Sequence, residues 1–184
     1  MLSEMGALIV RHGGVPFAAP VLQEVLASDT PEVAALVDDL CAGELDVVIL
    51  QTGVGTRALF EAAANRGLKQ KLLDTLARII VVARSPKPAS VLRKNKVRID
   101  IMPPEPFTSG DLIVAVQDMD FRQKEVAVQA YGGPNSLLTK TLKERGANVR
   151  EVSLYTWGLP NDLAPVLELI DKLVAGTISA VAFT

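Results

Sequence analysis

Three segments of this sequence carry residue types that can bind an anion where a strand gives way to a helix. In the first, 46–60 (DVVILQTGVGTRALF), an apolar run enters a loop with glycines and a helical pattern follows. Backbone N–H groups at a helix start have no partner inside the helix, so they can hold an anion there. Thr52 and Thr56 would add hydroxyls, and Arg57 would add positive charge. A tight turn with a capping threonine explains the same residues equally well.

Two further segments repeat this arrangement of strand, loop and helix. The first is 79–89 (IIVVARSPKPA), whose loop carries Arg84 and Lys87. A solvated basic loop is the ordinary interpretation, and contact with a carboxylate is the sharper one. The second is 126–138 (VAVQAYGGPNSLL), where Asn135 or Ser136 could cap the helix after a loop of Tyr131, Gly132, Gly133 and Pro134. Three such loops from one parallel sheet would line one edge together, which suits a polyanionic ligand without identifying a reaction.

The residue inventory excludes several conventional chemistries. The loop after residue 51 lacks the Gly-Lys-Ser/Thr ending of a P-loop, and its glycines do not have the GxGxxG spacing. There is no GxSxG elbow, no obvious pair of catalytic carboxylates, and only one cysteine (Cys41) and one histidine (His12), too few for a conventional zinc site. We interpret Cys41 as a small buried hydrophobe on a helix and His12 as a polar helix end. An enzyme built this way would work by positioning, backbone dipoles and a Tyr or Thr hydroxyl.

The composition is that of a globular protein without a nucleic-acid partner. Of 184 residues, 49% are hydrophobic and 22% are charged, and the formal net charge is -2. The absence of a basic excess argues against nucleic acid. No apolar run reaches transmembrane length and no signal-peptide pattern follows Met1, so we expect a cytoplasmic protein that does not bind a membrane.

Apolar strand-like runs alternate with helical patterns along most of the chain. Helices are expected at 2–11, from the Thr30 cap to Gly43, before Gly146 and before Gly176, because apolar residues recur there at helical spacing. Nearly all-apolar strands separated by amphipathic helices predict an α/β fold, with parallel sheets flanked by helices. The expected strands are 15–19, 46–51, 78–83, 97–102, 125–130, 149–155 and 179–183.

Both ends of the sequence look cut. Met1 leads straight into a helical segment with no strand before it. The last expected strand stops at Thr184, where a parallel-sheet unit should turn into a loop and a helix. We therefore expect the part of the fold that these two ends build to be incomplete.

The order of segments over essentially the whole chain resembles the uroporphyrinogen-III synthase family. No single motif of this divergent family is diagnostic, but the ordered set is fairly specific. The resemblance implies a two-domain HemD-like fold that is truncated here at both ends. Its inserted domain would span 27–152, and residues 1–24 and 155–184 would belong to a discontinuous first domain, joined by a two-stranded linker. The segments that carry the resemblance are 5–25 (MGALIVRHGGVPFAAPVLQEV), 81–116 (VVARSPKPASVLRKNKVRIDIMPPEPFTSGDLIVAV), 126–160 (VAVQAYGGPNSLLTKTLKERGANVREVSLYTWGLP) and 170–184 (IDKLVAGTISAVAFT).

The family implies a lyase of haem biosynthesis that uses neither a metal nor an organic cofactor. Its substrate is hydroxymethylbilane, a linear chain of four pyrroles that bear acetate and propionate groups. The hydroxyl leaves, the last ring is inverted through a spiro intermediate, and the macrocycle closes. By this resemblance we expect one small-molecule partner, hydroxymethylbilane, and a monomeric protein.

The resemblance also implies roles for individual residues. Tyr155, in SLYTW, matches a family tyrosine and would donate a proton to the leaving hydroxyl, although a structural tyrosine at a strand end explains it equally well. Thr52 keeps the hydroxyl of a family Thr/Ser pair, and Thr184 matches a hydroxyl residue after the returning strand. A threonine of some members aligns near Pro88, so backbone or Lys87 would replace it. The expected substrate-binding residues are Thr52, Gly53, Arg84, Lys87, Gly132, Gly133, Asn135 and Thr184.

Two other hypotheses compete with the synthase. One is a non-catalytic HemD-like module that senses a ligand or regulates, because such domains occur fused to regulatory domains. The other is a generic flavodoxin-like or periplasmic-binding-like domain that binds small anions and has no affinity for tetrapyrroles. A complete first domain would favour the enzyme, and an appended winged helix would favour regulation.

Overall fold

The computed structural model of this chain describes residues 2–27, 29–130 and 136–183. The chain forms two compact units. Unit 1 consists of residues 1–24 and 157–184, and unit 2 is the continuous stretch 25–156.

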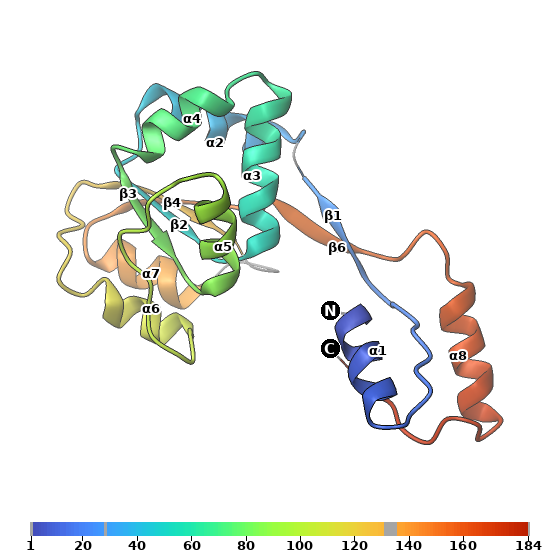
Figure 1. The fold of residues 1–184 in the computed structure, drawn as a ribbon. Coiled ribbons are helices and arrows are strands. Elements are labelled where there is room, and N and C mark those ends of the chain that lie inside the picture. Colours follow the sequence, from blue (N-terminus) through green and yellow to red (C-terminus); the bar gives the residue numbers. More distant parts are fainter. Residues whose placement is uncertain (1, 28, 131–135, 184) are drawn as a thin grey trace. The chain divides into compact units, whose positions relative to one another are not determined.

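A four-stranded sheet forms the centre of unit 2 (Figure 1). Its strands are β2 (Val47–Leu50), β3 (Ile80–Ala83), β4 (Glu125–Gln129) and β5 (Asn148–Val152), in the order β3-β2-β4-β5. All three neighbouring pairs are parallel. The parallel α/β sheet that the alternation of apolar strands and amphipathic helices predicts is thus confirmed.

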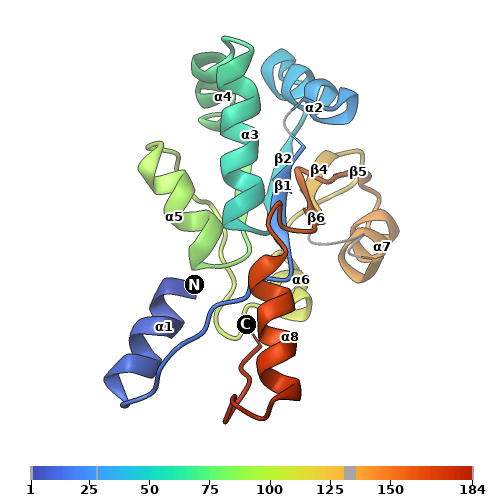
Figure 2. The same cartoon turned by 90° about the vertical axis from the view of Figure 1, so that its right-hand side faces the viewer.

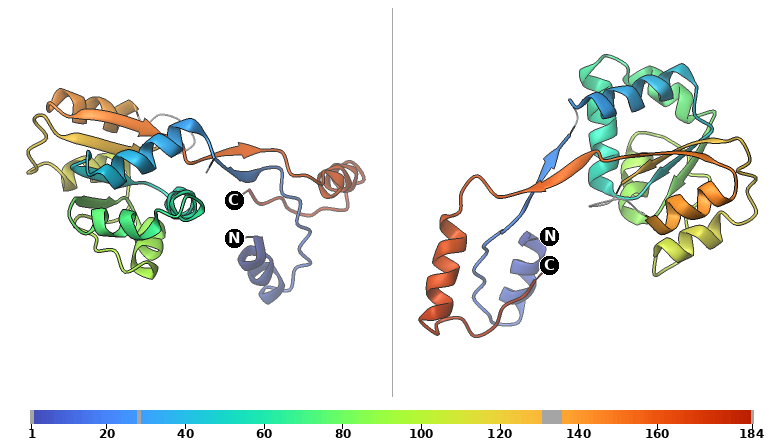
Figure 3. Two further views of the ribbon diagram at one scale, coloured as in Figure 1. Left: turned by 90° about the horizontal axis from the view of Figure 1, so that it is seen from above. Right: turned by 180° about the vertical axis from the view of Figure 1, so that it is seen from behind.

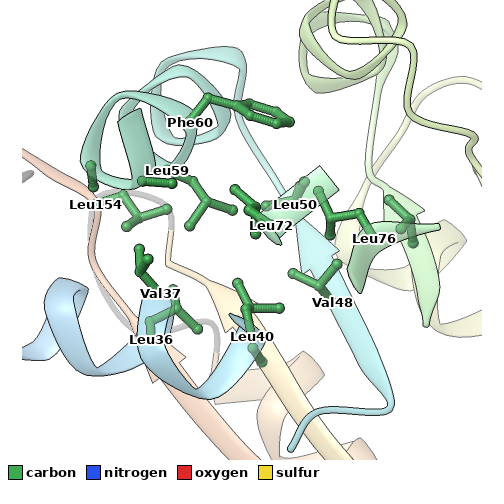
Figure 4. Packing of buried hydrophobic residues seen from close by; sticks show 14 of the residues in the cluster. Leu36, Val37, Leu40, Val48, Leu50, Leu59, Phe60, Leu72, Leu76 and Leu154 are labelled. Atoms are coloured by element: carbon green, nitrogen blue, oxygen red, sulfur yellow. The ribbon is translucent and has the colours of Figure 1, made fainter. Parts of the chain in front are cut away.

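Helices cover both faces of this sheet, and the strands alternate their side chains between two hydrophobic clusters. Val48 and Leu50 join the cluster under α2 (Pro31–Ala42), α3 (Gly53–Asn65), α4 (Lys69–Leu76) and α5 (Pro86–Lys94). Figure 4 shows part of this packing. Val47 and Ile49 join the cluster under α6 (Ser109–Ala115) and α7 (Ser136–Glu144). Successive side chains of a strand point to opposite faces, and all four residues of β2 (VVIL) are apolar. β2 is therefore buried on both faces.

The two helical layers can be followed in the figures. Figure 2 shows α3 and α5 on one side of the sheet and α7 on the other. Figure 3 shows α6 and α7 next to each other on that second face. The helix ends have the expected signals, since Thr30 caps α2 and Gly43 ends it with a φ of 79° that suits glycine. Cys41 is buried on this helix, as its interpretation as a small hydrophobe requires.

Unit 1 contains α1 (Leu2–Arg11) and α8 (Ala164–Val174). The helix expected at 2–11 is confirmed at both ends, and His12 follows it directly. Within this unit the Lys172 ammonium lies 5.3 Å from the centre of the Phe17 ring. The strands β1 (Gln23–Leu26) and β6 (Tyr155–Gly158) pair in a two-stranded sheet, and both boundaries between the units fall within these strands.

Four of the seven expected strands, 15–19, 97–102, 149–155 and 179–183, are corrected by the structure. Segments 15–19 and 179–183 are not strands, and Val15 and Phe183 are more than 90% exposed. The segment 15–19 contains Pro16, which lacks the N–H that a ladder needs. The expected strand 149–155 is divided into β5 and the beginning of β6, and β1 lies outside every expected range.

The expected strand at 97–102 is reduced to a single bridge between Ile101 and Val82. The reason is that side chains occupy the edge of β3 there. The Asp100 carboxylate accepts the Val81 N–H at 2.7 Å, and the Arg98 guanidinium donates to the carbonyl of Ile79 at 2.7 Å. A regular strand would need those same backbone groups.

Candidate functional site

The candidate site lies at the carboxyl ends of β2 and β3. The two strands are parallel neighbours, and Leu50 is in register with Ala83 at their ends. The loops that follow therefore leave the same edge of the sheet. The structure brings Thr52 and Gly53 together with Arg84 and Lys87 at this edge. Their role as substrate ligands stays a prediction.

Thr52 is the N-cap of α3. Its hydroxyl accepts the Gly55 N–H at 3.1 Å, and its carbonyl accepts both the Thr56 N–H at 3.0 Å and the Thr56 hydroxyl at 2.7 Å. The capping threonine, one of the two interpretations of this segment, is thus present. Gly53 and Val54 occupy the first two helical positions, where an N–H has no intrahelical acceptor. These two N–H groups and the helix dipole suit an anion at this helix start.

The loop after β3 packs directly against this helix start. A Cβ on Gly53 would lie 3.2 Å from the carbonyl oxygen of Lys87, so the two backbones approach more closely than most side chains allow. Helix α5 itself offers few donors, because Pro86 and Pro88 lack an N–H in its first turn. The contribution of this loop to an anion site therefore comes from the Lys87 ammonium, which is exposed, and from the Lys87 N–H.

Arg84 connects the same edge to a third loop. Its Nε donates to the carbonyl of Phe107 at 3.0 Å, just before the Thr108 cap of α6. The side chain is half-buried and is held in position, so its charge is fixed beside the loop after β3.

Two buried glutamines at this edge were not among the site residues that the sequence predicted. Gln51 and Gln129 follow the apolar runs VVIL and VAV, and both are buried. The Gln129 Oε1 accepts from Thr52 N–H at 2.8 Å, and Gln51 Nε2 donates to the carbonyl of Gln129 at 2.7 Å. The available signal was a polar side chain placed directly at the end of a strand that is buried on both faces.

Tyr155 is the first residue of β6 and is 5% exposed. It follows Leu154, which belongs to the larger hydrophobic cluster. Its ring is therefore largely removed from water, as a structural tyrosine would be, and its proposed chemistry would need the phenol oxygen to reach substrate. The predicted residues Gly132, Gly133, Asn135 and Thr184 lie outside the described residues.

The pKa of two carboxyls is lowered at the other edge of the sheet, where β2 and β4 begin. The N–H of Glu125 and the ammonium group of Lys124 lower the pKa of Asp46 below its ordinary value. Arg122 lowers the pKa of Asp120 to about 2 through side-chain and backbone hydrogen bonds.

Within the described ranges no group of three or more His, Cys, Asp or Glu residues could hold a metal ion. None of the helices in those ranges has the length and apolar character that a bilayer crossing needs.

Comparison with known proteins decides the family. The family model described as "Uroporphyrinogen-III synthase HemD" matches residues 3–184. This chain belongs to the uroporphyrinogen-III synthase family. The fold agrees, because a mutant uroporphyrinogen III synthase from the bacterium Thermus thermophilus is similar over 96% of this chain, with 30% identity and a TM-score of 0.69.

The relatives of this family member are distant and longer. It is 30% identical to a "Putative uroporphyrinogen-III synthase" of Methanothermobacter thermautotrophicus, over 99% of this chain and 68% of that protein. It is 28% identical to the "Uncharacterized protein YjjA" of Bacillus subtilis, over 98% of this chain and 66% of that protein. The chain thus spans about two thirds of the length of these relatives, and of the Thermus synthase it covers 66%.

Proposed function

We propose that this protein is a uroporphyrinogen-III synthase, which closes hydroxymethylbilane with inversion of the last pyrrole ring in haem biosynthesis. The observation that carries the proposal is the family match over residues 3–184. The geometry of unit 2 supports it, because a helix start, a lysine and an arginine lie at one sheet edge, and the substrate carries acetate and propionate groups.

The proposed chemistry needs little from the protein beyond positioning and a proton. The N–H groups of Gly53 and Val54 and the charges of Arg84 and Lys87 would hold substrate carboxylates and so fold the chain of pyrroles. Tyr155 would protonate the departing hydroxyl, which leaves as water while the electron-rich pyrrole supplies the electron pair. Gly132, Gly133, Asn135 and Thr184 complete the proposed set of substrate contacts, and no organic cofactor or metal is part of the proposal.

The test is a coupled assay on the longest form of the protein that its gene encodes. Porphobilinogen deaminase supplies hydroxymethylbilane, and the oxidised products are separated into type I and type III uroporphyrin. We expect type III in excess over the type I product of uncatalysed closure. Formation of type I alone, at the uncatalysed rate, would refute the synthase.

Tyr155→Phe tests the proton donor. We expect type III formation to slow about a hundredfold, because general acid catalysis contributes that much or more, while substrate folding by backbone contacts survives. An unchanged rate would remove the phenol from the mechanism and leave positioning as the contribution of the protein.

One observation favours the second candidate, a non-catalytic module that binds a tetrapyrrole. The side chain of Tyr155 is buried, as a residue with only a structural role would be. Tight binding of uroporphyrin III without any type III product in the coupled assay would support this module against the enzyme.

A further inference from the structure

The side-chain amide of Gln129, at the end of β4, is the hydrogen-bond centre of the candidate site. It is 2% exposed. Its Oε1 accepts from the Gln51 N–H at 3.0 Å, from the Thr52 N–H at 2.8 Å and from the Thr52 hydroxyl at 3.2 Å. One buried oxygen thus satisfies three donors of the loop that leads into α3. Such donors are costly to leave unpaired away from water.

The other half of the amide bonds within its own strand end, and the Gln51 side chain adds a second tie between the loop and β4. The Gln129 Nε2 donates to the carbonyl of Ala130, and Gln51 Nε2 donates to the carbonyl of Gln129 at 2.7 Å. The ends of β2 and β4 are therefore joined by bonds from two side chains as well as by the backbone ladder.

The amide is also held sterically under the first turn of α3. A Cβ added to Gly55 would lie 2.5 Å from Nε2 and 2.8 Å from Oε1 of Gln129. Only glycine leaves room for the amide there, so the helix start and the glutamine fix one another. Because the amide is neutral, it holds the loop without a negative charge next to the N–H groups of Gly53 and Val54.

We propose that Gln129 is a positioning residue for the reaction. Its amide fixes the N-cap Thr52, and through it the direction in which the first N–H groups of α3 meet a substrate carboxylate. It does not touch substrate. This inference rests on the proposed function, because the synthase reaction gives those N–H groups their ligand.

The test uses two variants of Gln129 and one matched control. Gln129→Met keeps the length of the side chain and removes the acceptor, and Gln129→Glu keeps the acceptor but adds charge. Gln70→Met makes the same chemical change on the exposed surface of α4. We expect Gln129→Met to raise KM for hydroxymethylbilane about tenfold or more, with kcat changed much less, because a hydrogen bond to a charged group is misaligned. Gln70→Met should match the wild type.

KM separates positioning from a loss of folded protein. A smaller folded fraction lowers the apparent kcat but leaves KM unchanged, since the remaining molecules bind substrate normally. Amide hydrogen exchange gives a second readout, in which Gln51 and Thr52 should lose protection in Gln129→Met while Val82 in β3 keeps it. Gln129→Glu should retain this protection and still raise KM, because its charge repels the substrate carboxylates.

Several outcomes overturn the proposal. One is a KM for both Gln129 variants within about twofold of the wild type, which is smaller than the loss of one hydrogen bond predicts. Another is a change confined to kcat. If Gln129→Met does not fold, Gln129→Asn takes its place under the same criteria, because its neutral amide is one methylene too short to reach the same donors.

If the wild type makes no type III product, the proposed function fails but Gln129 can still be tested. Benzenehexacarboxylate is then titrated while the amide signals of Gly53 and Val54 are followed by NMR. A shift in the wild type that is lost in the Gln129 variants supports the positioning role, and no shift in the wild type overturns it.

Discussion

The two units of this protein differ in how completely their helices are covered. In unit 2, α2 alone buries five residues, and the strands of its sheet place apolar side chains in two clusters. In unit 1, none of the described residues of α1 or α8 is buried, and Leu167 on α8 is 60% exposed. Both helices are nevertheless amphipathic in sequence.

This difference in burial shows that forming a helix and stabilising a fold have different requirements. A helix satisfies its hydrogen bonds internally and can form wherever the pattern favours it, whereas most of its stability in a protein comes from packing. A strand needs a neighbouring strand for every hydrogen bond. Unit 2 supplies both the neighbours and the packing, and this is why the candidate site on its sheet edge is well defined.

The largest expected effect compares one leucine from each unit. Leu40 on α2 is 0% exposed, and Leu167 on α8 is 60% exposed. Leu40→Ala should lower the free energy of unfolding by about 2–5 kcal/mol, because it leaves a cavity in a filled core. Leu167→Ala should change it by about 0.5 kcal/mol or less. Urea unfolding of both variants measures this, and equal losses would remove the contrast between the units.

The next effect compares two glycines that both lack room for a methyl group. A Cβ on Gly55 would meet the buried amide nitrogen of Gln129 at 2.5 Å, whereas a Cβ on Gly14 would meet the Cγ2 methyl of Ile9 at 2.7 Å. Gly55→Ala should cost about 1–3 kcal/mol of unfolding free energy, because a filled interior resists overpacking.

Gly14→Ala should cost less, because Gly14 is exposed and Ile9 is only partly buried, so this segment can shift toward solvent. Thermal unfolding of the two variants side by side gives the ranking. A larger loss for Gly14→Ala would show that unit 1 is the more tightly packed one.

The smallest effect concerns the ionic contact at the amino end of the unit 2 sheet. The Glu125 N–H and Lys124 lower the pKa of Asp46 below the 3.8 of an unperturbed aspartate. Its contribution to stability is therefore present above the unfolded value and is lost as the pH falls through the folded one. Asp46 and Lys124 are each more than a third exposed, so screening keeps this contribution below about 1 kcal/mol.

Asp46→Asn should consequently cost little at pH 7, and its difference from the wild type should shrink as the pH falls below 3.8. Urea unfolding across this acid range measures the difference. A difference that is the same at pH 7 and at the acid end would contradict the role of the ionised carboxylate.

The sequence predicted the strands of unit 2 better than those of unit 1, because a strand forms only where a neighbouring strand completes its hydrogen bonds. The runs at 46–51, 78–83 and 125–130 each became a strand, because neighbours exist to complete their ladders. The runs at 15–19 and 179–183 are just as apolar but have no ladder partner among the described residues. Periodicity reports what a side chain prefers, and pairing depends on another part of the chain.

The candidate site was predictable from the sequence only in part. The cap at Thr52 and the shared edge with Lys87 follow from strand–loop–helix order and parallel pairing. The part played by Gln129 could not be predicted, because it is 78 residues from Gln51 in the sequence and only the sheet order brings β4 next to β2. Hydrogen bonds of this kind are a property of topology, and local patterns do not encode them.

The continuity of unit 2 has a consequence for how the protein is made. Its residues 25–156 form one uninterrupted stretch, whereas unit 1 is divided between the two ends of the chain. On the ribosome, domains fold as their residues emerge, at about 5–20 residues per second. Unit 2 can therefore close its sheet and its edge loops once residue 156 has emerged, whereas unit 1 needs residues from both of its segments. The segment 1–24 waits until residues 157–184 have also emerged, so the sheet edge with the candidate site can be assembled before unit 1 is complete.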